Sequence, residues 1–181
     1  MIERAFLDDS ILQFRKLQRL AEKAIAQVAH EQFFDTLDPE ANSIALLVKH
    51  MAGNMRSRWT DFLTSDGEKP DRDRDREFER EPGDTYDSLM ERWHDGWARL
   101  FGTLASLGAE DLSRMVSVRG EAHSVLEAIN RQLAHYAQHV GQIVLLAKHL
   151  KGSAWRSLSI PRGKSKEFDV AKSGKTISVD R

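Results

Sequence analysis

Three histidines combine the residue type and the spacing best suited to chemistry in this sequence. His135 and His139 are four residues apart in RQLAHYAQHVGQI. On a helix this spacing places both imidazoles on one face, with Cβ atoms about 5–6 Å apart. Two such rings can bind one divalent metal ion, and His50 could supply a third nitrogen from another predicted helix. Three protein ligands leave one position open for water or substrate, which is typical of catalytic metal sites.

The same histidines also have an interpretation without a metal, as polar residues at the edge of a helical core, because H-x₃-H pairs arise by chance. Asn54, one turn after His50, and Gln142, near the histidine stripe, are candidates to hold the unused ring nitrogens. The remaining histidines lack a partner at ligand spacing and are expected at the surface or half-buried: His30, His94, His123 and His149.

The composition limits the other chemistry available to the chain. Its 181 residues include no cysteine, which excludes disulfides, thiolate ligands and cysteine nucleophiles. Any metal must therefore bind nitrogen and oxygen, and imidazole ligands suit Zn, Ni, Fe or Cu. The glycine-rich motifs of nucleotide-binding proteins and the G-x-S-x-G motif of serine hydrolases are absent.

Charge and hydropathy favour a cytoplasmic protein, and a small-molecule substrate is expected from the metal hypothesis. The formal net charge of −1 argues against a general nucleic-acid binder, although the tail after Lys151 is basic and leaves weak DNA binding as a minor alternative. Apolar runs stay far below the roughly 20 residues that span a bilayer. The N-terminal MIERAFLDDS is too charged for a signal peptide. We therefore expect no nucleic-acid and no membrane partner.

Four amphipathic helices are expected to position the histidines, because apolar residues recur at helical spacing in four long segments. No such helix can bury its apolar stripe alone, so the pattern predicts an all-α four-helix bundle. A single domain over residues 1–168 is expected, with a short irregular C-terminal segment followed by a flexible tail over 169–181. The predicted helices cover about 2–37, 43–63, 85 to at least 104, and 124–151.

The residues at the predicted helix ends support these ranges. Asp38-Pro39 ends the first helix, because the residue before a proline is pushed out of helical geometry. Ser124 and Glu127 form a capping box at the start of the fourth helix, and Gly152 is a natural C-cap. Candidate N-caps of the second and third helices are Asn42 or Ser43, and Asp84 or Thr85.

Several segments lie outside this helical pattern. Acidic and basic residues alternate over 71–77 within the loop 65–84, which predicts a solvated, self-neutralising loop. The strand-like residues 115–118 are expected to be part of a loop and not of a sheet. Arg162, in a turn over 159–163, is available to an anion or substrate. Two tryptophans fit either the core or a dimer interface: Trp59 and Trp97.

The sequence resembles the DinB-like, or YfiT-like, superfamily of bacterial metal-dependent proteins, and within it a branch described only as a domain of unknown function. The resemblance covers the chain from the first helix to about Phe168. An aromatic residue commonly follows the KP of the loop in this branch, where this chain has Asp71. Three segments carry the resemblance: NSIALLVKHMAGNMRSRWTDFLTSDGEKP at 42–70, RQLAHYAQHVGQIVLLAKHL at 131–150 and SLSIPRGKS at 157–165.

The resemblance implies an up-down-down-up four-helix bundle, often a homodimer, whose metal ligands match His50, His135 and His139. Characterised relatives include S-transferases that use low-molecular-weight thiols and a thiol-dependent isomerase, with Zn or Ni as the usual metal. It therefore implies a metal-dependent transferase that joins a small thiol to electrophiles in detoxification or stress. A metal-dependent hydrolase and a non-catalytic dimeric metal-binding stress protein remain as alternatives.

Overall fold

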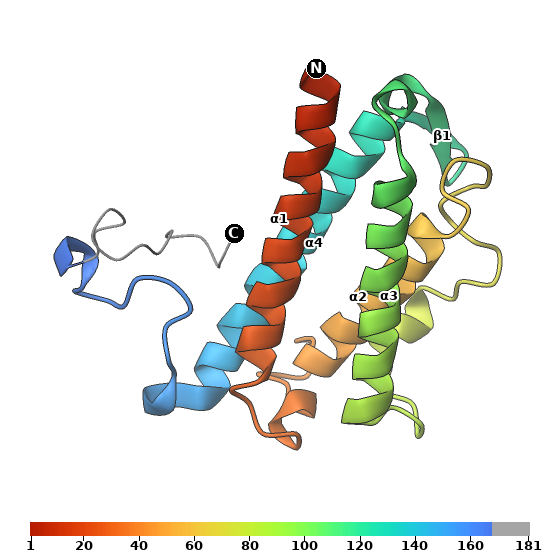
Figure 1. Cartoon of the computed structure of the whole chain (residues 1–181). Helices are drawn as coiled ribbons and strands as arrows, with labels where there is room; N and C mark the ends of the chain where they lie inside the picture. Colours follow the sequence, from red (N-terminus) through yellow and green to blue (C-terminus); the bar gives the residue numbers. More distant parts are fainter. Residues whose placement is uncertain (168–181) are drawn as a thin grey trace.

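Four long helices and one small hairpin make up the fold in the computed structural model, which describes residues 1–167 (Figure 1). The predicted tail over 169–181 lies outside the described residues. Within residues 1–167, no helix has the combination of length and apolarity needed to cross a membrane. The helices are α1 (Ile2–Ile25), α2 (Ile44–Trp59), α3 (Tyr86–Ser106) and α4 (Val125–Lys151), and the strands are β1 (Met115–Val118) and β2 (Glu121–Ser124). Short 3₁₀ turns are η1 (Gln32–Phe34), η2 (Asp75–Phe78), η3 (Ala109–Ser113), η4 (Gly152–Ala154) and η5 (Ser165–Glu167).

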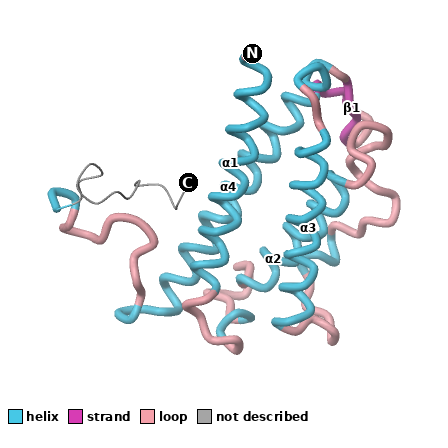
Figure 2. Tube along the Cα trace, viewed as in Figure 1, coloured by secondary structure: helices cyan, strands magenta, loops and turns pink. Residues whose placement is uncertain are grey.

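The helices pack as two neighbouring pairs, α1 beside α4 and α2 beside α3 (Figure 1). The connection between α2 and α3 is long and mostly irregular, and its first part passes close to the hairpin (Figure 2). A backbone hydrogen bond from Gly67 N to Ser117 O (2.8 Å) joins this connection to β1. The connection therefore packs against the helices and the hairpin.

One aromatic side chain from each helix meets in the centre of the core. Phe14 of α1 lies 5.8–6.4 Å, between ring centroids, from Trp59 of α2, Trp97 of α3 and Tyr136 of α4. Trp59 Nε1 donates a hydrogen bond to the Tyr136 hydroxyl (3.1 Å), which donates to Asn54 Oδ1 (2.9 Å). Trp59 and Trp97 are buried within this chain, so they belong to the core and are not available to a dimer interface.

The caps follow the sequence pattern closely. Ser43 and Thr85 cap α2 and α3, each accepting a hydrogen bond from a backbone N–H three residues on. At the start of α4, Ser124 Oγ accepts from Glu127 N (3.2 Å) and Glu127 Oε2 accepts from Ser124 N (2.7 Å). Gly152 ends α4 with a positive φ of 57°, a conformation that favours glycine. The predicted bounds of α4 are confirmed.

The predicted end of the first helix near Leu37 is wrong, since α1 ends at Ile25. The chain turns there and forms η1, which buries Phe33 against the ring of Tyr86 at a centroid distance of 5.0 Å. Apolar spacing continues past residue 25, but tertiary burial of the phenylalanine outweighs continuation of the helix.

The second helix is also shorter than predicted, ending at Trp59 and not near Leu63. Asp61 adopts a left-handed φ of 49°, and its carbonyl oxygen accepts from the backbone N–H groups of Thr64 and Ser65 (both 3.0 Å). This turn redirects the chain into the long connection.

The prediction of a loop without strands over 115–118 is wrong, because β1 and β2 form an antiparallel hairpin in which Val116 faces His123. Val116 and Val118 point inward and are buried, at the two-residue period of a strand. Two residues, Arg119 and Gly120, make the turn, with φ values of 58° and 75°. Four-residue strands carry too little periodicity to be separated from a loop by sequence.

Replacing Ser124 by alanine is expected to lower the free energy of unfolding by about 1 kcal/mol, because it removes both the side-chain acceptor and the partner of Glu127. Urea denaturation followed by circular dichroism measures the change. Ser153→Ala, an exposed serine just beyond α4, is the control. Equal losses in the two variants would contradict the assigned cap.

Candidate metal centre

The three histidines selected from the sequence lie together, His50 in the middle of α2 and the other two one turn apart on α4. The Nε2 atom of His135 is 3.3 Å from Nε2 of His50 and 3.0 Å from Nε2 of His139. His50 is buried, and the other two are half-buried. The three residues could together hold a metal ion.

Hydrogen bonds on the far side of two rings determine which nitrogen points into the centre. His50 Nδ1 lies 2.8 Å from Glu77 Oε2, and His139 Nδ1 lies 2.7 Å from Gln142 Oε1. A carboxylate or amide oxygen can only accept, so each Nδ1 carries the hydrogen. In a neutral ring the Nε2 lone pair then faces the centre, which is the form that binds a metal.

Burial keeps the rings on α4 neutral. It lowers the pKa of His135 to about 3, with further lowering by the neighbouring charges of His139, His50 and Arg72. Burial also lowers the pKa of His139, against an opposite effect of the Gln142 hydrogen bond. Neutral imidazole is the protonation state that metal coordination requires.

The arrangement passes a geometric test for a metal. Ligand distances of about 2.0–2.1 Å in a tetrahedral site place nitrogen atoms about 3.3–3.4 Å apart. The observed Nε2 separations of 3.0 and 3.3 Å are close to this value. Without a metal, a hydrogen on His135 Nε2 could be donated to Nε2 of His50 or to Nε2 of His139, but not to both. The lone pair of the other ring would then face His135 Nε2 with no hydrogen between the two nitrogens. A cation resolves this conflict, and the residues present therefore fit a bound metal.

Glu77, which sequence analysis missed, is anchored by a buried ion pair. Arg72 Nε donates to Glu77 Oε1 (2.8 Å) and Arg72 Nη2 donates to Glu77 Oε2 (2.7 Å). Burial alone would raise the pKa of Glu77, but the hydrogen bonds from Arg72 and His50 hold it below its usual value. The ionised carboxylate is thus fixed against the His50 ring.

The prediction of a solvated, self-neutralising loop over 71–77 needs correction for this reason. Its exposed members, including Asp73 and Asp75, agree with the prediction, but Arg72 and Glu77 point inward. A signal for this was Phe78, an aromatic residue directly after the charged run. Its ring stacks on His50 at a centroid distance of 4.6 Å.

Gly53 makes room for this carboxylate. A Cβ atom at that position would lie 2.2 Å from Glu77 Oε1 and 2.8 Å from its Cδ, far inside van der Waals contact. A flexible side chain could normally move aside, but Glu77 is held by Arg72 and His50. Any larger residue at 53 would therefore displace the carboxylate from the histidine.

A comparison with protein families finds a match over residues 1–164 to the model described as protein of unknown function DUF1572. The chain belongs to this family. A comparison with functionally curated proteins finds no match. The match covers all three histidines and Glu77, but family membership assigns no reaction, which must be argued from the site.

Of the other predicted site residues of this DUF1572 protein, two line the cavity or contact a histidine and one lies away from the site. Gln142 contacts His139, as expected, whereas Asn54 accepts from Tyr136 and lines the cavity wall. Arg162 is exposed and does not line the cavity, so the structure does not bring it to the histidines.

The histidines open onto a cavity of about 370 Å³. Its walls come from α2, the long connection, the hairpin turn and α4, and they are rich in arginine. A larger hollow of about 920 Å³ lies between the start of α1, η3 and the start of α4, but none of the three histidines lines it. Geometry and chemistry therefore place the candidate site in the smaller cavity.

Replacing Gly53 by alanine is expected to weaken zinc binding about 10-fold or more, because the new methyl group displaces Glu77 from His50. Competition with a chromogenic zinc chelator measures the affinity. Gly141→Ala in α4 is the matched control, since a Cβ there meets open space. Both substitutions raise helix propensity, so unchanged zinc affinity in Gly53→Ala would contradict the role of the glycine.

Proposed function

We propose that this DUF1572 protein is a cytoplasmic, metal-dependent enzyme of the DinB-like superfamily. His50, His135 and His139 hold one divalent ion, zinc or nickel, with one coordination position open to the cavity. The observation that carries the proposal is the convergence of three histidines from two helices: Nε2 of His135 lies 3.3 Å from that of His50 and 3.0 Å from that of His139, and hydrogen bonds at Nδ1 aim the His50 and His139 rings at the centre. A structural metal site is closed by four protein ligands, whereas these three histidines border a cavity.

The up-down-down-up bundle of that superfamily is part of the proposal. Its support is the direction of the helices in Figure 1, where α1 and α4 run toward one end and α2 and α3 toward the other. Two neighbouring helices of the same direction need a long connection, and residues 60–85 provide one.

The reaction that we propose is transfer of a small thiol to an electrophile, in detoxification or stress. A divalent ion supplies a Lewis acid that lowers the pKa of a thiol or water, so that a nucleophile exists near pH 7. The chain has no cysteine, so the sulfur must come from a cosubstrate. In the transfer, sulfur forms a bond to the electrophilic carbon, the leaving group departs with the bonding electron pair, and the thiol proton goes to solvent.

The chain's own residues hold the ligands of this site in place. Glu77 fixes the ring of His50 and Gln142 that of His139. Outer hydrogen bonds of this kind orient the ring and increase the basicity of the ligand nitrogen.

Metal content measured by mass spectrometry on untagged protein tests the site. We expect close to one zinc or nickel ion per chain in the wild type and loss of the metal in His135→Ala/His139→Ala. A matched variant, His94→Ala/His149→Ala, removes two exposed histidines and should keep the metal. Absence of metal from the wild type, even after zinc or nickel is added, would contradict the site.

Turnover assays test the reaction. The metal-loaded protein is expected to consume a chloro-aromatic substrate only when a small thiol is added, and metal removal should abolish the activity. Hydrolysis of esters without any thiol would favour the hydrolase alternative. No turnover, together with unfolding on metal removal, would favour the non-catalytic metal-binding protein.

A further inference from the structure

The cavity beside the histidines carries more positive charge than its neighbouring carboxylates neutralise. Three carboxylates pair with the side chains of its arginines, Glu68, Glu77 and Glu121, and a fourth, Asp66, accepts from the backbone N–H of Arg119 (2.9 Å). The wall arginines number five, which leaves one positive charge in excess of these four carboxylates even before a metal is added. They are Arg58, Arg72, Arg74, Arg119 and Arg131.

The carboxylates are unevenly shared. The single carboxylate of Glu68 is shared by three arginines: Arg58 (2.9 Å), Arg72 (3.2 Å) and Arg119 (3.2 Å). Within residues 1–167, the carboxylate that pairs with Arg131 is that of Glu121, at 4.0 Å, and the side chain of Glu121 is 70% exposed. An ion pair of this length and exposure stabilises little.

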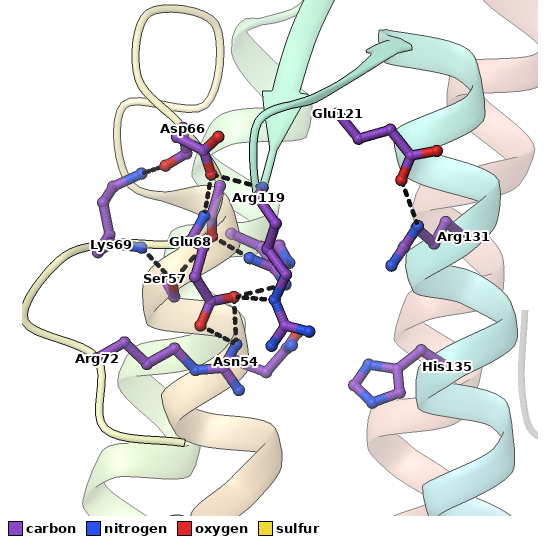
Figure 3. A network of polar contacts seen from close by, with 12 residues as sticks. Asn54, Ser57, Asp66, Glu68, Lys69, Arg72, Arg119, Glu121, Arg131 and His135 are labelled. Atoms are coloured by element: carbon purple, nitrogen blue, oxygen red, sulfur yellow. Dashed lines mark hydrogen bonds and ion pairs between the residues drawn. The ribbon is translucent and has the colours of Figure 1, made fainter. Parts of the chain in front are cut away.

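The side chains of Arg119 and Arg131 are 52% and 48% exposed, whereas the buried Arg58 and Arg72 are held by Glu68 and Glu77. Arg119 pairs with Glu68 through Nε (3.2 Å) but remains half exposed. Arg74 is exposed too, with its guanidinium over the Phe78 ring. Arg119 and Arg131 are therefore the candidates to bind a ligand. Arg131 precedes His135 by one helical turn and shares its face of α4. In Figure 3, Arg131 and His135 project from α4 toward the side of the cavity on which Arg119 lies.

Arg119 occupies a position that an arginine seldom takes. It is the first residue of a two-residue hairpin turn with positive φ at both positions, where asparagine and glycine are favoured. An L side chain in this left-handed region is sterically disfavoured, and such positions concentrate at functional sites. The turn directs the guanidinium to the cavity at a cost in stability.

A buried polar atom on the same wall has no partner. Gln132 is 4% exposed and lines the cavity, and within residues 1–167 its Oε1 atom makes no hydrogen bond. A buried polar group without a partner is unfavourable, so this acceptor is suited to a hydroxyl or N–H of a bound molecule.

We propose that the substrate or thiol cosubstrate is a small organic anion whose carboxylate or phosphate binds Arg119 and Arg131 while its reacting end faces the histidines. The inference rests on the proposed function, since it names the class of molecule that this site takes. The planar guanidinium fork matches both anions, because two parallel N–H groups reach two oxygens. The cavity volume of about 370 Å³ limits the ligand to a small molecule.

Isothermal titration of the zinc-loaded full chain with succinate, inorganic phosphate and the neutral analogue succinamide tests the proposal. We expect at least one of the two anions to bind and succinamide not to bind. Arg119→Asn and Arg131→Gln should each weaken anion binding about 10-fold, and Arg99→Gln, on α3 and paired with Asp95, should not. Arg119→Asn should also raise the thermal unfolding midpoint, because asparagine adopts the left-handed backbone of this turn with less steric strain. If Arg119 instead had a purely structural role, the substitution would lower the midpoint.

The same titrations on metal-free protein separate this inference from the proposed function. Anion binding that remains without metal and still depends on Arg119 and Arg131 supports the anion site even if the chain binds no metal. Anion binding that disappears with the metal and is insensitive to both substitutions would overturn the anion site while leaving the metal centre intact. No binding of either anion would also overturn it.

Discussion

The candidate site depends on one buried interaction, the carboxylate of Glu77 held between Arg72 and His50. An ionised carboxylate taken out of water is costly unless it is paired and fully hydrogen-bonded. Two donors from Arg72 and one from the imidazole meet this requirement. The contact of Glu77 with His50 ties the connection between α2 and α3 to the face of α2. It therefore closes one wall of the cavity and also orients the ring of His50, a candidate metal ligand. Gly53 leaves the space that this contact needs.

The opposite wall is positioned by the core. Tyr136 lies next to His135 on α4, and its ring packs into the aromatic cluster to which every helix contributes one residue. Its hydroxyl links Trp59 and Asn54 of α2. Because these contacts fix the rotation of α4 relative to α2, they also determine where the imidazoles of α4 point. Core packing and site geometry are therefore coupled through adjacent residues.

The hairpin turn is held by a different carboxylate. Asp66 accepts from the Ser117 hydroxyl (2.5 Å) and from the backbone N–H groups of Glu68, Arg119 and Gly120 (2.7–2.9 Å). Burial alone would raise the pKa of Asp66, but these hydrogen bonds hold it well below its usual range. The connection thus stabilises the strained turn that carries Arg119. In the proposal, a bound anion offsets the repulsion between the arginines of the cavity wall and the candidate metal centre.

Features that depend on neighbours along the chain could be predicted without the structure. The H-x₃-H face of α4, its capping box and its glycine end follow from helical period and local hydrogen bonding, so they could be predicted. The role of Glu77 could not, because Phe78 signals that part of the charged run is buried but does not tell which of its charges folds inward. Only the tertiary structure brings that carboxylate to a histidine 27 residues away and adds the arginines of the hairpin and connection, since contacts between distant segments are decided by packing and burial, which no local pattern encodes.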